Sequence, residues 1–421
     1  MNDAENLNAT LARELPVAFR CLSPLGRRVA FPRGIPFQAA QAKHAPINAT
    51  IGQITDGSGQ PLPLGPLAPL AQTLDARRAF LYTPIDGPAD LDDAWQARQH
   101  RLANNPSVST SRPVVTHGLT HAMSIVADLF VDDETDVVLS NPYWENYDLL
   151  FGLRARPRFI RYDAFREGRF NVEGLGDALA QVRNKAVVVL NFPGNPTGYQ
   201  PTPDEARAIA AILHAHQGPA VVVSDDAYQG WVYAEGRQTR SVFWEIADGA
   251  DLERLLPIKV DGATKELVFF ASRVGFLAHR TGGEAADLAL RSKIKAVIRG
   301  TVGSASGPAL DMVAKALAAP DLEAAFEAKR RILAERWATL REALQGLPAN
   351  RATVYPFHGA FFGLLQLAPD LNAEQLRQRL IAEHGVGTIA FPDVNALRVA
   401  FCSIANERLP EVGQALAKAL L

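Results

Sequence analysis

Lys265 and Arg273 are two charged residues whose sequence surroundings suggest chemistry. Lys265 lies in the segment 260–266, with small residues before it, and the apolar run 267–271 comes after it. Poor solvation there favours the neutral amine, which lowers its pKa and makes it a usable nucleophile. Arg273 also has small and apolar neighbours, so we expect its guanidinium to bind an anion.

An amine that can form a Schiff base, next to a fixed phosphate clamp, is what pyridoxal 5′-phosphate (PLP) chemistry requires. One lysine and one arginine alone are equally consistent with ordinary ion pairs. The choice between these readings therefore depends on the other polar motifs of the chain.

Asp225 and Tyr228 follow the apolar strand predicted at 220–224. A carboxylate buried at the end of a strand needs a partner. A protonated pyridine nitrogen would be such a partner, and the pairing makes the ring an electron sink. Tyr228 would bond the ring oxygen. The alternative is an Asp225 that caps the following helix.

Three further motifs follow predicted strands. Gly118-Leu119-Thr120 opens a helix, so its free N–H groups predict a phosphate cradle. Trp144 could stack on a planar ring, although a core or capping tryptophan is the alternative. Asn195, in the proline- and glycine-rich loop 191–198, presents an amide to a phenolate oxygen.

The elements that must position these residues form an α/β pattern. From residue 114 onwards, continuous apolar strands alternate with helices, which indicates a mostly parallel sheet covered on both faces. Ligands of such sheets bind at the carboxyl ends of the strands, where these polar motifs lie. A long amphipathic helix is predicted at 321–345, followed by a smaller α+β region.

Length and composition exclude several classes of protein. The chain has 421 residues and a formal net charge of −2, which predicts two domains and no field that attracts nucleic acid or anionic membrane. Cys21 and Cys402 are the only cysteines, which fits a reducing compartment. We find no metal-ligand spacing, membrane span or signal peptide, and we expect a cytoplasmic protein.

Together these motifs resemble the aspartate aminotransferase family, the class I aminotransferases of PLP fold type I. The resemblance runs in order from about Asn48 to the C-terminus. It implies a large PLP-binding domain at 66–310 with a seven-stranded type of sheet. It also implies a small domain built from 15–65 and 311–421.

The resemblance also implies a role for each matching residue. Lys265 matches the Schiff-base lysine, and Asp225 and Tyr228 match the D-x-x-Y element. Arg398 and Gly52 match the residues that hold the substrate carboxylate. The remaining cofactor residues implied are Gly118, Leu119, Thr120, Trp144, Asn195, Arg273 and Tyr82, of which Trp144 and Asn195 also face substrate and Tyr82 reaches the phosphate of a neighbouring subunit.

The sequence departs from the family pattern at two positions and leaves one role open. Gly262 stands where many members have a serine that contacts the phosphate, and Glu266 after the lysine has no explanation in the sequence alone. Arg299 resembles an arginine that crosses the dimer interface to bind a side-chain carboxylate. A basic residue favoured by the helix dipole is the alternative reading of Arg299.

The interpretation is therefore a homodimeric PLP-dependent aminotransferase with shared active sites. It would move an amino group between an L-amino acid, acidic or aromatic, and a 2-oxo acid. A PLP lyase catalysing β-elimination uses the same residues and remains an alternative; Arg398 argues against decarboxylation. A PLP-sensing regulator would need a DNA-binding module, for which the residues before the fold leave little room.

Overall fold

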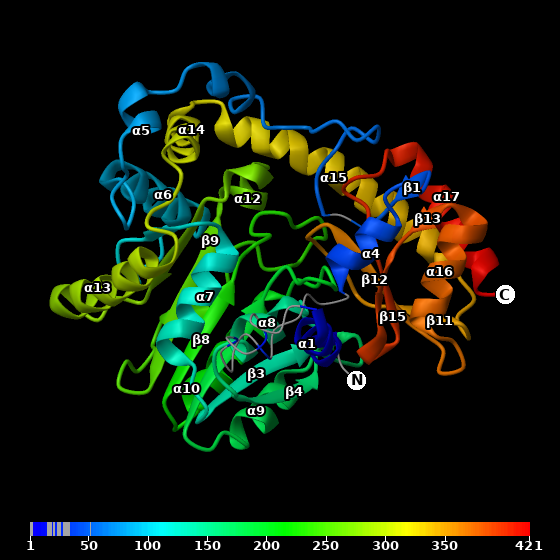
Figure 1. Ribbon diagram of the computed structural model, residues 1–421, viewed down its shortest axis with the longest axis horizontal. Coiled ribbons are helices and arrows are strands. Elements are labelled where there is room, and N and C mark those ends of the chain that lie inside the picture. Colours follow the sequence, from blue (N-terminus) through cyan, green and yellow to red (C-terminus); the bar gives the residue numbers. More distant parts are fainter. Residues whose placement is uncertain (1–2, 15–18, 20–21, 23–26, 28–33, 51) are drawn as a thin grey trace.

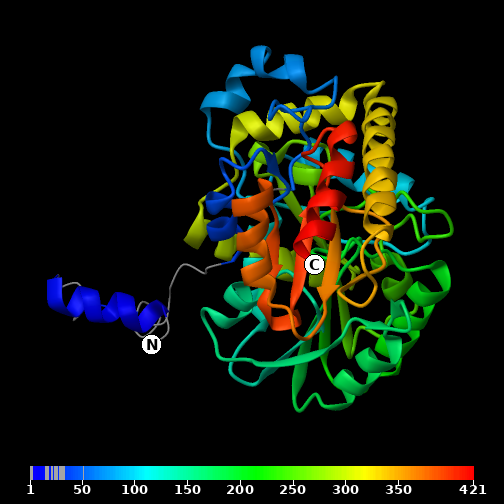
Figure 2. The same ribbon diagram turned by 90° about the vertical axis from the view of Figure 1, so that its right-hand side faces the viewer.

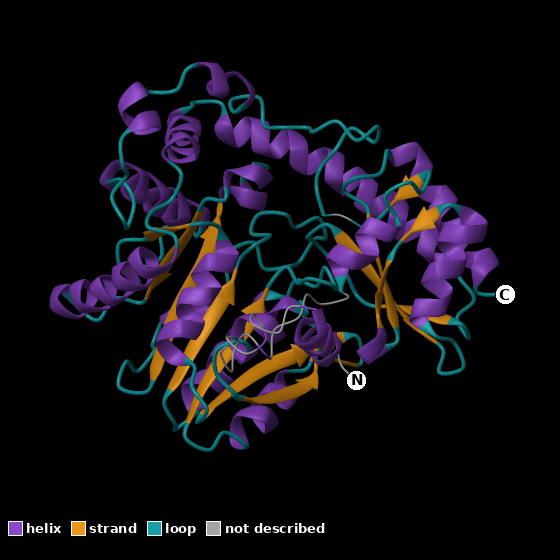
Figure 3. Ribbon diagram, in the orientation of Figure 1, coloured by secondary structure: helices purple, strands orange, loops and turns teal. Residues whose placement is uncertain are grey.

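A seven-stranded sheet forms the centre of the larger part of the protein (Figures 1 and 3). The computed structural model describes residues 3–14, 19, 22, 27, 34–50 and 52–421. Strand β10 runs antiparallel to both neighbours and the other pairs are parallel, which confirms the predicted mostly parallel sheet. In spatial order the strands are β2 (Val114–Thr116), β10 (Gly275–His279), β9 (Leu255–Gly262), β8 (Ala220–Asp225), β7 (Lys185–Asn191), β3 (Thr135–Asn141) and β4 (Arg158–Asp163).

Both faces of this sheet are covered, which explains the continuous apolar strands. Neighbouring residues of a strand point to opposite faces. On β7, Val187 and Val189 pack in one hydrophobic core, and Val188 and Leu190 pack in another. The covering helices are α6 (Ala89–Leu102), α7 (Leu119–Phe130), α8 (Asn146–Gly152), α9 (Val172–Ala180), α10 (Pro203–Ala215), α11 (Phe243–Ala247), α13 (Glu284–Thr301) and α14 (Gly307–Ala318).

The helices show the local signals that start and orient them. Helix α10 begins with a capping box, in which the Thr202 side chain accepts from the Glu205 N–H and the Glu205 side chain accepts from the Thr202 N–H. Its buried residues Ala206, Ile209 and Leu213 recur at three- and four-residue steps, so one side of the helix faces the sheet.

A second, antiparallel sheet forms the smaller part, with the strand order β11-β12-β15-β14. Helices α16 and α17 pack beside it in Figure 1. This α+β arrangement confirms the predicted fold class. Its elements are β11 (Ala352–Val354), β12 (Phe362–Leu367), β15 (Ala396–Ala400), β14 (Ile389–Phe391), α16 (Ala373–His384), α17 (Leu409–Ala419) and the parallel pair β1 (Ile47–Asn48) with β13 (Val386–Gly387).

The long helix α15 (Leu322–Gln345) runs from one part to the other, as Figure 1 shows. Phe326 and Leu333 belong to the core of the larger part, whereas Trp337 and Leu340 belong to the core of the smaller part. The predicted amphipathic helix is therefore confirmed, with its start one residue later.

The N-terminal region, residues 1–45, is described only in part. Its described portions include the helices α1 (Asp3–Glu14) and α4 (Ile35–Gln41); several other positions, Cys21 among them, lie outside the described residues. Helix α1 stands clear of the body in Figure 2.

Helix α14 continues through the boundary predicted between residues 310 and 311, so the domain limits stay a prediction. None of the helices in the described ranges combines the length and the apolar character that a membrane span requires.

The remaining elements are short connections. They are α5 (Ala76–Phe80), α12 (Ala263–Glu266), the hairpin β5 (Phe165–Arg166) with β6 (Arg169–Phe170), and the 3₁₀ turns η1 (Ala68–Gln72), η2 (Phe270–Ser272), η3 (Pro392–Val394) and η4 (Asn406–Arg408).

Candidate active site

Lys265 lies on the one-turn helix α12, directly after strand β9 ends at Gly262. A Cβ atom at position 262 would lie 2.6 Å from the Val274 carbonyl oxygen and 2.8 Å from the Cα of Gly275. A serine would therefore clash there, which explains the departure from the family pattern. The hydroxyl of Thr264 is buried and has no hydrogen-bond partner within the described ranges, so it is available to a ligand.

The Lys265 amine has the environment that the sequence predicted. Burial lowers its pKa below the ordinary lysine value, and Arg273 lowers it further, whereas the Asp225 carboxylate opposes this shift. The Nζ atom lies 5.1 Å from the centroid of the Tyr228 ring. The Lys265 carbonyl accepts a 3.0 Å hydrogen bond from the Trp231 indole, which fixes the backbone.

Asp225 ends strand β8 and is buried, as predicted. Burial raises the pKa of this carboxyl, while hydrogen bonds from Tyr147 and the Ala227 N–H and the charge of Lys265 favour its ionised form. Tyr147 donates a hydrogen bond of 2.5 Å to Oδ2 of Asp225. The side chain of Asn191 holds the Asp225 carbonyl at 2.7 Å.

Tyr147 is a site residue that the sequence interpretation missed. It lies in the same motif as Trp144, three residues further on, in the first turn of α8, whereas Trp144 precedes that helix. The Trp144 and Tyr147 rings meet edge to face with centroids 5.4 Å apart. Trp144 is half-buried, which leaves part of its indole open to a ligand.

A phosphate-sized cradle lies where helix α7 begins. Gly118 has φ +80°, and a Cβ there would lie 2.6 Å from a terminal nitrogen of Arg273. The guanidinium therefore lies against the glycine, beside the open N–H groups of Leu119 and Thr120. Arg273 has no hydrogen bond or ion pair with another described residue, and burial lowers its pKa. These donors fit the phosphate of PLP.

Arg398 on strand β15 lies at the other side of the site, from the small sheet. One terminal nitrogen donates to Oδ1 of Asn195 at 2.9 Å and the other to the Thr50 carbonyl at 2.8 Å. The guanidinium carbon lies 4.2 Å from the centroid of the Phe362 ring. Burial lowers the pKa of Arg398 to about 10, and its Nε atom has no described partner.

Gly52 is placed close to the same arginine site. Gly52 comes two positions after Thr50, whose carbonyl accepts a hydrogen bond from Arg398. A Cβ at Gly52 would lie 2.7 Å from the Phe362 ring. The backbone can therefore approach the aromatic wall only because position 52 has no side chain.

Glu145 is a second residue that the sequence interpretation missed. Its Oε1 accepts a 2.6 Å hydrogen bond from the N–H of Ile35, at the start of α4. Its charge also favours the protonated form of Arg398, which raises that pKa against the effect of burial. No sequence signal distinguishes Glu145 from an ordinary helix-start acid, because its partners are remote in the chain.

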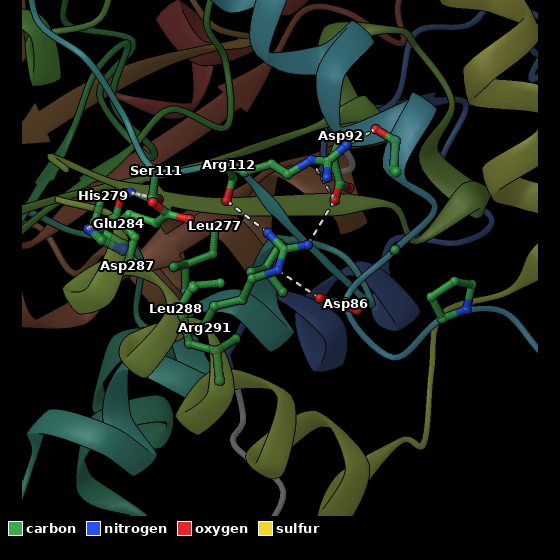
Figure 4. A pocket seen from close by; sticks show the side chains of 15 residues that line it. Asp86, Asp92, Ser111, Arg112, Leu277, His279, Glu284, Asp287, Leu288 and Arg291 are labelled. Atoms are coloured by element: carbon green, nitrogen blue, oxygen red, sulfur yellow. Dashed lines mark hydrogen bonds and ion pairs between the residues drawn. The ribbon is translucent and has the colours of Figure 1, made fainter.

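Two predicted site residues lie outside this cluster within one chain. Tyr82 is fully exposed, and Arg299 is exposed in the last turn of α13. The loop that carries Tyr82 is nevertheless fixed, because Arg291 of α13 binds Asp86 at 2.7 Å and Asp92 at 2.9 Å (Figure 4). These contacts line a separate cavity of about 670 Å³.

The chemistry of the cluster is defined by its donors. In the described part of the chain, no group of three or more His, Cys, Asp and Glu side chains could hold a metal ion. The site instead combines a lysine of lowered pKa, a buried carboxyl group, an arginine beside the start of a helix, and a second, buried arginine. The roles of the individual residues stay predictions.

Comparisons with known proteins also indicate an aminotransferase. A family model described as aminotransferase class I and II matches residues 45–416. The aspartate aminotransferase of Pseudomonas aeruginosa is 27% identical over 364 residues, which cover 83% of this chain and 88% of that enzyme. The aspartate aminotransferase of Bacillus subtilis is 26% identical over 200 residues, 47% of this chain and about half (48%) of that enzyme.

A solved structure supports the fold. The aminotransferase of Anaerococcus prevotii superimposes with a TM-score of 0.80 at 20% identity, over 94% of this chain and 98% of that chain. At this identity the likeness applies to the fold, and it agrees with the two sheets and the joining helix described above.

Proposed function

Because the chain belongs to the aminotransferase class I and II family, we propose that it transfers an amino group between an L-amino acid and a 2-oxo acid with PLP. One observation carries the proposal. Lys265 follows a strand of the large sheet and Arg398 lies in the small sheet, yet two touching rings join them. The lysine Nζ lies 5.1 Å from the Tyr228 ring centroid, the Tyr228 and Phe362 centroids are 5.7 Å apart, and the Arg398 guanidinium carbon lies 4.2 Å from the Phe362 centroid. The amine and the guanidinium therefore lie against one pair of aromatic side chains.

Different residues of the site would bind different parts of PLP. When bound, PLP supplies a sink for the electrons released at the substrate Cα atom. Arg273 and the start of α7 would hold the phosphate, Trp144 would stack on the ring and Asp225 would hold the ring nitrogen. Lys265 would form the covalent link, and the remaining contacts come from Tyr228 and Asn195 to the ring oxygen and from Gly118, Leu119, Thr120 and Thr264 to the phosphate.

The substrate would be held by its α-carboxylate. Arg398 offers a planar pair of donors that matches a carboxylate, and Asn195 and the backbone near Gly52 lie next to it. The Lys265 amine, once released from its covalent link, would take the proton from Cα as a base and deliver it to the C4′ atom of the cofactor as an acid, and the second half of the reaction would reverse this transfer. Its lowered pKa keeps the amine available as a base.

The absorbance of the PLP-loaded protein tests this function. Aspartate, glutamate, tyrosine, phenylalanine, methionine and alanine would be added singly, with measurement of the released 2-oxo acid. We expect loss of the cofactor band together with one equivalent of 2-oxo acid, and neither in Lys265→Ala. A cofactor band that persists while a β-substituent and ammonia are released would instead favour the β-elimination lyase.

The donor is an acidic or an aromatic amino acid in this proposal. The relatives named above are aspartate aminotransferases, and an acidic donor would need a second cation such as Arg299. The aromatic rings of Phe361 and Phe362 near the site would suit an aromatic donor. If only aspartate and glutamate react and Arg299→Ala removes this preference, Arg299 binds the side-chain carboxylate of the substrate. Any other result makes Arg299 a charge at the end of a helix.

The protein would act as a homodimer with shared sites. Phe80, Leu81 and Tyr82 form an exposed apolar segment, with 87%, 65% and 101% of their surface accessible, and such segments mark interfaces. A second copy would bring Tyr82 to the neighbouring phosphate. Mixing Tyr82→Ala with Lys265→Ala protein tests this, because one site of each hybrid dimer then carries neither change and activity returns. Activity that does not return contradicts shared sites.

A cytoplasmic location is supported by the low cysteine content, with only Cys21 and Cys402 in the chain. The domain limits 15–65 with 311–421, and 66–310, are supported by the two sheets. Limited proteolysis followed by mass determination tests these limits.

A further inference from the structure

Glu266, which follows Lys265, is bound to helix α6. It forms an ion pair with Arg98, and Gln99 donates hydrogen bonds of 3.1 and 3.2 Å to its two carboxylate oxygens. The Glu266 and Arg98 side chains are each 1% exposed. The turn that carries Lys265 is therefore docked on α6 by a fully buried ion pair, which explains the acid that the sequence alone left unexplained.

Asp226, which follows Asp225, is held by a second buried ion pair. Its carboxylate lies 2.7 Å from the Nζ of Lys259 on strand β9. The same Nζ lies 2.5 Å from Asp261, whose other oxygen accepts a 2.8 Å hydrogen bond from the Trp95 indole of α6. Successive residues of a strand point to opposite faces, so Asp226 faces away from the site that Asp225 faces.

These groups form one cluster, which we call the anchor cluster. Helix α6 binds both halves, because its Trp95 donates to Asp261 and its Arg98 pairs with Glu266, and the Arg98 guanidinium carbon lies 5.9 Å from the Trp95 ring centroid. Glu323 of α15 lies at its outer edge, 3.0 Å from Nε of Arg98. The anchor cluster consists of Arg98, Lys259, Asp226, Asp261 and Glu266.

We infer that the anchor cluster fixes the separation between the Lys265 amine and the Asp225 carboxylate. The inference rests on the proposed function. A pyridine ring is planar and rigid, and its nitrogen and the carbon that meets the lysine lie at opposite ends. Both ends can be engaged together only if the two protein groups are the right distance apart, and a misplacement of about 1 Å can cost roughly a hundredfold in rate.

Stability alone is a poor explanation for such a cluster. A buried ion pair gives up much of its attraction to the loss of hydration, and replacement of both partners by apolar residues of similar volume is often neutral or stabilising. Removal of one partner, in contrast, leaves an unpaired buried charge. If the pair only stabilises the fold, replacement of both partners should restore stability and activity together. If the pair positions Lys265, stability should return while PLP affinity and kcat stay impaired.

The experiment compares three variants of the full chain with the wild type. Glu266→Gln removes one charge and keeps the shape of the side chain. The double variant Arg98→Met with Glu266→Met removes the whole pair and keeps the volume. Leu213→Ala, in the buried core of α10, serves as a control for lost stability without a change near the site. Arg98 and Glu266 are positioning residues, because they act through Lys265.

Five quantities are measured for each variant. They are the unfolding temperature and PLP dissociation constant of the PLP-free protein, the fraction of Lys265 trapped by borohydride, and kcat and KM at saturating PLP. For Glu266→Gln we expect a PLP dissociation constant raised about tenfold, kcat lowered about tenfold and KM nearly unchanged, since Arg398 lies in the other sheet.

The double variant decides the inference. We expect its unfolding temperature to return towards that of the wild type while PLP affinity and kcat stay impaired. Recovery of all three together would overturn the inference, as would equal losses of affinity and kcat in Leu213→Ala. A wild-type protein in which borohydride labels no Lys265 would contradict the proposed function itself, so the two failures are distinguishable.

Discussion

The hydroxyl of Tyr147 lies 2.5 Å from Oδ2 of Asp225, and both side chains are buried. The tyrosine belongs to α8 and the aspartate to the end of β8, so a helix that covers the sheet holds a carboxyl group at the C-terminal end of a central strand. The hydrogen bond favours the ionised carboxylate, whereas burial opposes it. The carboxylate would be the partner of the cofactor ring nitrogen.

Tyr147→Phe removes this hydrogen bond and leaves the ring. The pKa of Asp225 then rises further, because burial is opposed only by the charge of Lys265 and the hydrogen bond from the Ala227 N–H. A hydrogen bond to a charged group contributes about 1.5–3 kcal/mol, so we expect kcat to fall at least about tenfold. The measurement is kcat at saturating PLP. In the control Tyr143→Phe, which loses a hydroxyl bonded to Asp148 instead, kcat stays near the wild-type value.

Gly118→Ala fills the contact with Arg273. The new Cβ would lie 2.6 Å from the guanidinium, and the residue keeps a φ of +80°. We expect the PLP dissociation constant to rise about tenfold or more, measured by titration of the PLP-free protein. Gly168→Ala has a similar φ of +74° with nothing within 4 Å, so it isolates the backbone strain. Equal effects in both variants would contradict the cradle.

The capture of PLP by Lys265 should depend on pH in a defined direction. Burial lowers the pKa of the amine below 10.5, so the reactive neutral form is populated at a lower pH than for an exposed lysine. The rate constant for PLP capture by the PLP-free protein should therefore rise with pH and level off below 10.5. A rate that still increases through that pH would contradict the burial argument, and Lys265→Ala gives the background.

Arg398→Lys replaces the planar pair of donors with a single ammonium group. The two hydrogen bonds to Asn195 and Thr50 cannot both persist, and the bidentate grip on a substrate carboxylate is lost. We expect KM for the amino donor to rise about tenfold to a hundredfold with a smaller change in kcat, measured by steady-state kinetics. Arg351→Lys, at a partly exposed pair with Asp370, should leave KM unchanged.

The sequence alone predicted the elements whose signals are local. The apolar runs around β7 and β8 predicted strands buried on both faces, and the spacing of Leu333, Trp337 and Leu340 predicted the long helix α15. The order of motifs around Lys265 and Arg273 predicted the family. Such signals are encoded within a few residues of one another, because strand and helix periods are local properties.

The tertiary structure decided the relationships between distant segments. Only packing brings Arg398 against Asn195 and Thr50, and only the docking of α6 explains Glu266 through Arg98. The crowding around Gly262 likewise depends on β10, a neighbour in space. The sequence by itself determined the residue types and the elements that carry them. Their distances, pKa values and partners were decided by the fold, because burial and electrostatic contacts arise between residues remote in the chain.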